Sequence, residues 1–510
     1  MKKALIGLLA LSCFVGFENV TAKEKVLYAK QMKEKAKNKK DKERYVSTFE
    51  DALIAAFANN QEWQAEKVEK QISKIRLRQS EMNFLPSITG SVSSQRSNEH
   101  TSAVDRGYID YENNISNFRS LNDNPTASSY TTTNHFGITV KQNIFAGWQT
   151  INAMSMRTNE DKATYHSLKA KGSKLIVDVL DAYSDVWKFR QVLAARIKME
   201  ENLKNILESQ RTKLSAGIST PAEVAAAEAN YQTAVYHRIS TETELFSAES
   251  KFEKITGVKL AKKVYLPDLH VTLPKNLDQF MANSRRLNHS ILESKFKEKA
   301  SLDALNVARG KLAPSVDASL QYGRSASYTH GNNVGYENSV NNTARRVTNN
   351  NSYRNTYSGT VEMTIPLFAN SGNDYSEIGI AEQNAKKAQF TANNTVLTVK
   401  EQCVVNWNTY IASDAMIVAC RTSVDSAQLS SESNQEESEL GMKSNTEVWD
   451  QENKLQESKI NFADSRKKRL VAAINIMYLM GRLELADLIK DTSKAVNKIK
   501  TANTRRRMRS

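Results

Sequence analysis

The residues that could do chemistry in this sequence gather in two matching segments, which begin at Leu214 and Leu440. Each segment places a glycine inside a long helical pattern and follows it, six and seven residues later, with a Glu-Val pair. After the second glycine the charged residues are Lys443, Glu447 and Asp450. Lysine and carboxylate groups at this spacing can form ionic contacts, although charges on a helix are often only solvated. The charged residues of these two segments are therefore predicted to form ionic contacts rather than a catalytic site.

Catalytic chemistry has little support elsewhere in the sequence. The seven histidines stand at positions 100, 135, 166, 237, 270, 289 and 330, and none pairs at a metal-ligand spacing such as i, i+4. The sequence contains no serine nucleophile elbow, P-loop or Rossmann glycine set. Cys403 and Cys420 fall in one helical pattern, about 25 Å apart, and cannot form a disulfide with each other. We predict a protein that is not an enzyme and that uses no metal or cofactor.

The elements that position these residues begin after a predicted secretory signal peptide, residues 1–22. A basic start precedes an apolar run and a small-residue ending at Val20-Thr21-Ala22, which is the pattern of a cleaved signal. Cys13 leaves a lipidated N-terminus open, although the preceding "ALS" lacks the aliphatic residue wanted three places upstream. No later segment approaches the roughly 18 consecutive apolar residues of a membrane helix. A membrane span would therefore have to use strands.

The net charge of +15 is concentrated at the two ends of the chain. A basic N-terminal extension, residues 23–46, and a basic C-terminal tail, residues 490–510, hold nearly all of it, and the body between them is close to neutral. Such charge runs favour solvated arms that contact acidic lipid, cell wall or a partner. Because the chain is predicted to be exported and its body carries little net charge, we expect no nucleic-acid partner.

The chain contains one structural unit twice. The two copies and the linker between them are predicted at residues 47–260, 275–489 and 261–274. In each copy a polar amphipathic helix runs into a proline, Pro86 or Pro314, and gives way to alternating polar and apolar residues. Further along, Gly217 matches Gly441 at a separation of 224 residues. Matching landmarks in one order at nearly one spacing indicate an internal duplication.

Four segments are predicted to be β-strands because polar and apolar residues alternate in them. They cover about 85–97, 132–146, 313–328 and 354–368. One apolar and one hydrated face fit lipid-exposed strands around a polar lumen, although a half-buried soluble sheet alternates in the same way. The Asn-, Ser- and Thr-rich segments 98–131 and 329–353 suit the outer loops of a membrane barrel. A closed barrel needs at least about eight strands, and an open edge cannot stay in lipid, so we expect closure between chains in an obligate oligomer.

Long helices are predicted for most of the remaining chain. They cover about 151–214 and 372–438, which contain no proline, and each is followed by a second helix, at 220–256 and 444–480. Helices of more than sixty residues span about 100 Å, and their narrow apolar stripe favours coiled-coil packing. Gly217 and Gly441 fall where each long helix must reverse into its antiparallel partner, because glycine adopts the left-handed backbone that such a turn needs.

The chain resembles the TolC family of outer-membrane channel proteins over nearly all of residues 47–489. The resemblance rests on "FEDALIAAFANN" leading to "LPSITGSVS", on "VKQNIFAGWQT" and "IPLFANSG" where strands join helices, and on the paired "G-x-x-x-x-x-E-V" segments. It implies a mixed α and β membrane protein, a homotrimer whose chains each give four strands to a shared transmembrane β-barrel, continued by a long α-helical coiled-coil barrel in the periplasm. It also implies a passive outer-membrane conduit for efflux or type I secretion, with a periplasmic adaptor protein and an inner-membrane transporter as partners.

The resemblance further implies roles for the charged residues at the glycine turns, which would lie at the periplasmic tip of the tunnel. Lys443 would link to Glu223 or a nearby group and hold the entrance shut, and Glu447 and Asp450 would form acidic rings that favour cations. The family usually has arginine and aspartate where this chain has Lys443 and Glu447. Because lysine cannot make the bidentate fork of arginine, we expect a weaker latch.

A rival function from another class uses the same elements. In it the chain is a secreted coiled-coil structural or adhesive protein, and its strands form a small soluble β domain. Heat-modifiable trimers in the outer-membrane fraction would indicate the channel, whereas a soluble elongated rod would indicate the rival.

Overall fold

The computed structural model describes residues 45–102, 109–110, 117–118, 126–268, 273–336, 343–368 and 370–485. The predicted signal peptide, Cys13, nearly all of the basic N-terminal extension and the basic C-terminal tail lie outside these residues. No helix among the described residues is long and apolar enough to cross a membrane.

The described chain consists of two copies of one unit, as the duplicated fold predicts. The first copy contains α2 (Phe49–Asn59), α3 (Gln61–Met82), β2 (Ser87–Ser102), β5 (Thr126–Ala146), α4 (Gln149–Ser215) and α5 (Pro221–Thr256). The second contains α6 (Leu277–Leu287), α7 (His289–Gly310), β7 (Ser315–Tyr336), β8 (Thr343–Thr364), α8 (Asn373–Glu439) and α9 (Asn445–Leu479). The minor elements are β1 (Tyr45–Val46), β3 (Ile109–Asp110), β4 (Asn117–Phe118), β6 (Lys259–Leu260) and the 3-10 turn η1 (Asn370–Gly372).

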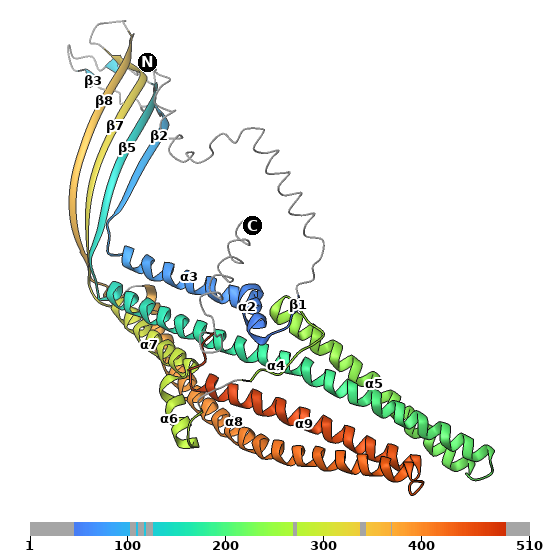
Figure 1. Ribbon diagram of the computed structural model, residues 1–510. Helices are drawn as coiled ribbons and strands as arrows, with labels where there is room; N and C mark the ends of the chain where they lie inside the picture. Colours follow the sequence, from blue (N-terminus) through green and yellow to red (C-terminus); the bar gives the residue numbers. More distant parts are fainter. Residues whose placement is uncertain are drawn as a thin grey trace, which may run out of the picture.

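The main sheet has the order β2-β5-β7-β8, and every neighbouring pair in it is antiparallel. Figure 1 shows these strands as a long, curved ribbon that projects from the helices. Within the described residues, β2 and β8 each have a strand on one side only. The sheet therefore ends in two open edges within a single chain.

The strands extend further into the predicted outer loops than the sequence pattern indicates. β2 reaches Ser102 and β5 starts at Thr126, while β7 reaches Tyr336 and β8 starts at Thr343. The Asn-, Ser- and Thr-rich sequence lacks apolar alternation there, yet the backbone ladder continues in register, because strand pairing itself satisfies the backbone groups. At its other end β8 stops at Thr364, short of the predicted 368, and Pro366 lacks the N–H that a ladder needs.

The long helices set the dimensions of the molecule. α4 and α8 contain 67 residues each, which corresponds to about 100 Å. α5 and α9 run back alongside them and complete two antiparallel hairpins. Figure 1 shows both hairpin tips at the end of the molecule opposite the sheet.

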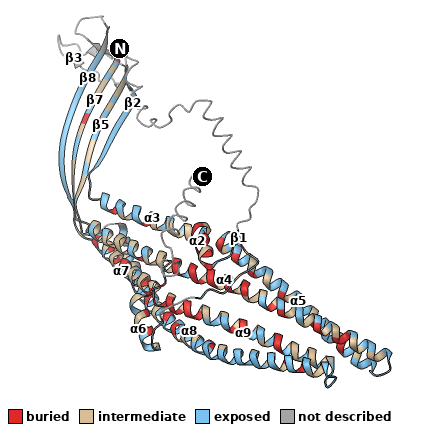
Figure 2. Cartoon of the chain, viewed as in Figure 1, coloured by how far each residue is buried: buried red, intermediate tan, exposed pale blue. Residues whose placement is uncertain are grey.

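The largest buried core lies where α2 packs against α4 and α5, in the middle of the helical body. Figure 2 shows the buried residues concentrated in this region, whereas the sheet is mostly exposed. Tyr183 is 1% exposed, and its hydroxyl donates to the carbonyl oxygens of Ser47 (3.2 Å) and Tyr265 (3.1 Å). Burial raises the pKa of Tyr183 to about 12, because the charged phenolate would lose its water. This core joins the two hairpins into one body.

Candidate functional site at the helical tips and on the sheet

Both long helices end in the same glycine-centred turn. Gly217 and Gly441 have φ angles of +78° and +74°, and a Cβ at either position would meet no atom within 4 Å. Backbone conformation rather than space therefore favours glycine here. In each turn the glycine N–H donates to the carbonyl three residues before it, and the next N–H donates to the carbonyl five residues before itself. This is the Schellman pattern that satisfies the last carbonyls of a helix.

Each returning helix begins with a capping box. The Glu223 N–H donates to Thr220 Oγ1 (3.3 Å), and the Thr220 N–H donates to Glu223 Oε2 (3.2 Å). Ser444 and Glu447 repeat these bonds at 3.4 Å and 2.9 Å. The turn and the capping box together explain the spacing of glycine and glutamate. The N-cap lies three positions after the glycine, and the capping-box glutamate lies three positions after the N-cap.

The capping bonds also set the ionisation of both glutamates. Hydrogen bonds from the Ser219 hydroxyl and the Thr220 N–H lower the pKa of Glu223. The N–H and then the hydroxyl of Ser444 lower the pKa of Glu447. Donors that bind the charged carboxylate favour it over the neutral acid. Both tips therefore carry a fixed negative charge at neutral pH.

Lys443 binds back onto its own hairpin. Its Nζ donates to Asn434 Oδ1 (2.5 Å) and lies 3.3 Å from Glu437 Oε2, both on α8. Glu223 belongs to the other hairpin, where its carboxylate accepts bonds from Ser219 and Thr220. Within one chain, Lys443 and Glu223 are therefore not brought together. Sequence reasoning did not identify Asn434, a polar residue nine positions upstream on an otherwise polar helix.

Asp450 is exposed on the first turns of α9, beside a large apolar anchor. Its neighbour Trp449 packs against a small cluster on the other hairpin, formed by buried Ile206, Leu207 and Ala227 with Leu203, Val224 and Tyr231. Sequence reasoning did not single out Trp449 either. The sequence did hold a signal for it, because Trp449 is the only tryptophan of α9 and directly precedes Asp450, a predicted functional residue.

A cluster of ion pairs joins the hairpins further from the tips. Lys467 of α9 lies 3.0 Å from Asp181 and 2.5 Å from Asp185, both on α4. Lys251 of α5 lies 2.8 Å from Asp181. Burial alone would lower the pKa of Lys467, but its hydrogen bonds to Asp185 and Asp181 raise it. Three helices from two hairpins therefore meet at one half-buried charge network.

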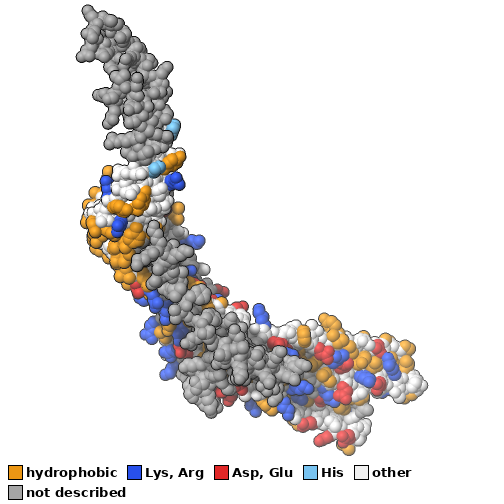
Figure 3. Space-filling view, turned by 90° about the horizontal axis from the view of Figure 1, so that it is seen from above, with side chains coloured by type: hydrophobic (Ala, Val, Ile, Leu, Met, Phe, Trp, Pro, Cys, Tyr) orange, Lys and Arg blue, Asp and Glu red, His pale blue; other side chains and the backbone are white. Residues whose placement is uncertain are grey.

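The two faces of the sheet differ in chemistry. One face exposes apolar side chains to the outside of the chain, and Ile88, Val92 and Val361 are 70%, 81% and 71% exposed. Figure 3 shows apolar side chains gathered on the described part of this end of the molecule. On the opposite face, hydroxyls meet across the strands, with Thr131 and Thr329 at 3.2 Å and Thr133 and Ser327 at 3.2 Å. The apolar face suits lipid, and the hydroxyl-rich face suits water.

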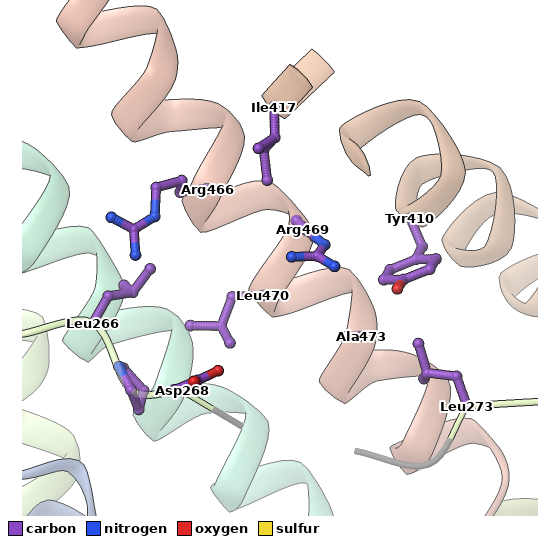
Figure 4. A pocket seen from close by; sticks show the side chains of 10 residues that line it. Leu266, Asp268, Leu273, Tyr410, Ile417, Arg466, Arg469, Leu470 and Ala473 are labelled. Atoms are coloured by element: carbon purple, nitrogen blue, oxygen red, sulfur yellow. The ribbon is translucent and has the colours of Figure 1, made fainter. Parts of the chain in front are cut away.

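A cavity of about 510 Å³ lies between the linker and the α8/α9 hairpin. Figure 4 shows Arg466 and Arg469 of α9 beside it, facing Leu266 and Asp268 of the linker and Tyr410 of α8. Arg466 lies over the Trp187 ring, and Arg469 pairs with Asp414 at 2.9 Å. Both guanidinium groups therefore already have partners, Arg466 in a ring contact and Arg469 in an ion pair. Among the described residues, no group of three or more His, Cys, Asp or Glu side chains could hold a metal ion.

Long helical hairpins joined to a sheet with one lipid-suited and one water-suited face define an elongated channel subunit of a bacterial outer membrane. The sequence model of the family described as "Outer membrane efflux protein" matches residues 53–258 and 281–482. The chain belongs to this family, and the resemblance to TolC proteins is confirmed. It is an efflux channel protein of the outer membrane.

Known relatives match along most of the chain. The outer membrane efflux protein BepC of Brucella suis biovar 1 (strain 1330) is 23% identical over 436 residues, which is 86% of each chain. The outer membrane protein TolC of Salmonella enteritidis is 21% identical over 383 residues, or 74% of each chain.

Solved structures share the fold. The CmeC outer membrane channel of Campylobacter jejuni superposes with a TM-score of 0.66 at 15% identity, covering 89% of each chain. The open state of the MtrE outer membrane channel of Neisseria gonorrhoeae gives a TM-score of 0.59 at 13% identity, covering 85% of this chain and 88% of that one.

Proposed function

We propose that three copies of this chain form a passive conduit from the periplasm to the exterior. β8 of one copy pairs with β2 of the next, so that the sheets close into one barrel whose apolar face contacts outer-membrane lipid. The observation that carries the proposal is the pair of open edges on a sheet with an exposed apolar face. Unpaired backbone groups cannot remain in lipid, and closure between copies pairs both edges at once.

The helical tips are the entrance in this proposal. Both hairpins end on the side of the molecule opposite the sheet (Figure 1). Symmetry brings three copies of Glu223, Glu447 and Asp450 around the axis, where rings of carboxylates favour cations. Lys443 holds its turn against Asn434 and Glu437 in this conformation. Opening moves the α8/α9 hairpin away from the axis and releases this turn. Contacts between Lys443 and Glu223 of a neighbouring copy form in the closed assembly.

Partners complete the transport system. A passive conduit has no energy source of its own, so a periplasmic adaptor protein and an inner-membrane transporter must deliver cargo to its tips. The chain's relatives include a protein described as an outer membrane efflux protein, which favours efflux over secretion of proteins by the type I route.

The test is the oligomeric state in detergent together with single-channel conductance in a planar bilayer. Wild type, Lys443→Ala and the control Lys454→Ala are compared, since Lys454 is an exposed lysine of α9, the helix that follows the Lys443 turn. We expect a trimer with small conductance that rises in Lys443→Ala and not in Lys454→Ala. A trimer whose conductance ignores Lys443→Ala would remove the gate assignment alone. A soluble monomer without conductance would contradict the conduit itself and favour a structural role.

A further inference from the structure

His135 and Arg354 lie at one level of the hydroxyl-rich face of the sheet. Ser93 of β2 is opposite His135 of β5, His135 is opposite Ser325 of β7, and Ser325 is opposite Arg354 of β8. Residues directly opposite each other in antiparallel strands share a face. The imidazole and the guanidinium therefore belong to one row, with a single strand between them.

This row faces away from the apolar side. The next residue of β5 after His135 is Phe136, which is 44% exposed and lies opposite Val92 and Arg324. Because successive side chains of a strand point to opposite faces, Phe136, Val92 and Arg324 face lipid when His135 faces the lumen. Arg324 is thus an arginine at nearly the same height on the other side of the sheet.

Two glycines hold open the space that the His135 ring occupies. Gly137 and Gly323 lie opposite each other in the adjacent row of the luminal face. A Cβ at Gly137 would stand 3.0 Å from His135 Nε2, and a Cβ at Gly323 would stand 3.2 Å from His135 Cε1. The imidazole therefore lies over both glycine backbones, and its position is set by the sheet.

The neighbouring rows of this face are uncharged. Below the His135 row they consist of Thr89, Thr139, Gln321 and Ser358, and of Ser91, Gly137, Gly323 and Thr356. Above it they consist of Gln95, Thr133, Ser327 and Ser352, and of Ser97, Thr131, Thr329 and Asn350. At the helical end of the sheet, Lys141 lies 4.0 Å from Asp317, and Glu362 is opposite Asp317, so that end of the face carries one lysine and two carboxylates. The His135 row is therefore a basic level between uncharged rows.

We infer that Arg354, in the row that it shares with His135 and repeated in the trimer, forms a cationic collar inside the barrel that favours anionic solutes and retards cations on their way out. The inference rests on the proposed trimeric conduit, because it needs the hydroxyl-rich face to line the lumen. Fixed charges around a pore raise the local concentration of the opposite charge. The substrate class that this collar favours is small anions and amphiphiles with an anionic group.

Among the described residues, the charged side chains nearest to the collar on this face lie three rows away. Above it is Glu99 of β2, opposite Ser129, and below it is Lys141 of β5, opposite Ser319. Two uncharged rows separate each of them from the collar.

The test is the reversal potential of single channels in a potassium chloride gradient near 0.1 M, where the screening length is about 10 Å. All proteins carry Glu223→Gln, Glu447→Gln and Asp450→Asn, so that the carboxylates at the entrance do not set the selectivity. At pH 8 we expect Arg354→Gln to lower the anion-to-cation permeability ratio about twofold. Arg324→Gln, which removes the same charge from the lipid face, should leave the ratio unchanged.

Each outcome separates the two proposals. Channels that conduct but show equal ratios in wild type and Arg354→Gln would overturn the collar and leave the conduit standing. An equal loss in Arg324→Gln and Arg354→Gln would also overturn it, because the effect would then not depend on the face. A chain that forms no channels would remove the conduit itself.

Discussion

Glu223 and Glu447 combine two roles in one carboxylate. Each closes a capping box at the start of a returning helix, and each is placed at the tip where symmetry would bring copies together. The capping bonds keep the carboxylate charged by stabilising its ionised form. A residue that looks like a pore charge in the sequence is therefore also a determinant of the turn.

At the residue scale, the two roles of Glu447 can be separated by substitution. Glu447→Gln keeps a capping-box acceptor and removes the charge, whereas Glu447→Ala removes both. We expect amide exchange at the α8/α9 tip, measured by mass spectrometry, to be about fivefold faster in Glu447→Ala, because the Ser444 N–H loses its acceptor. Glu447→Gln should stay close to wild type. Equal acceleration in both variants would show that charge rather than capping holds the turn.

The same carboxylate gives the tip a pH dependence. Because the pKa of Glu447 is lowered by folding, its contribution is present above the ordinary value of 4.5 and is lost as pH falls through the lower folded value. After correction for intrinsic exchange rates, tip protection in wild type should therefore fall below that range. Glu447→Gln should show no such loss from this site.

At the scale of elements, Trp449 links the two hairpins just above the tips. Its ring packs on the cluster of Ile206, Leu207 and Ala227. If opening separates α9 from α4, this contact must break first. Trp449→Ala should therefore favour the open packing by about 2 kcal/mol, which is less than the usual cost for a fully buried ring because Trp449 is only half-buried.

Single-channel conductance measures this effect. We expect larger and longer openings in Trp449→Ala than in wild type. Met442→Ala, in the adjacent exposed turn, removes an apolar side chain without a core contact and should leave conductance unchanged. Unaltered openings in Trp449→Ala would mean that the hairpins do not separate at this point.

The ion-pair network around Lys467 joins the same hairpins further up. Lys467→Ala would leave Asp181 and Asp185 facing each other, with Lys251 as their remaining ion-pair partner among the described residues. We expect the free energy of unfolding to fall by about 2 kcal/mol, because removing one partner leaves a half-buried charge uncompensated. Lys468→Ala is the matched control, since its exposed pair with Asp464 lies on a single helix and is worth about 0.5 kcal/mol. Equal thermal midpoints for the two variants would contradict a structural role for the network.

At the scale of the whole molecule, the sequence predicted the architecture better than the contacts. The duplication, the four strands and the long helices followed from periodicity and from landmarks such as Gly217 and Gly441. These features are local, and local signals can be read from one sequence. The strand ends were misjudged, because a ladder of Ser, Thr and Asn pairs well without leaving an apolar pattern.

Contacts between segments far apart in the chain could not be predicted from the sequence. The residues that Trp449 packs against depend on how one hairpin lies on the other, and the partners of Lys443 depend on how the turn folds back on α8. Neither arrangement leaves a periodic signal. The row shared by His135 and Arg354 likewise needed the register of three strands, which a one-residue slip would have destroyed.

The equal length of the two halves has a further consequence. α4 and α8 each contain 67 residues, and α5 and α9 contain 36 and 35. In a tunnel wall built from both halves, a helical hairpin that became two turns longer on its own would extend beyond its neighbours. The gaps beside its tip would then let cargo leave the tunnel sideways. Tunnel depth is therefore a shared property of the two repeats, and it can change only through paired insertions or deletions at matching heights in all four long helices.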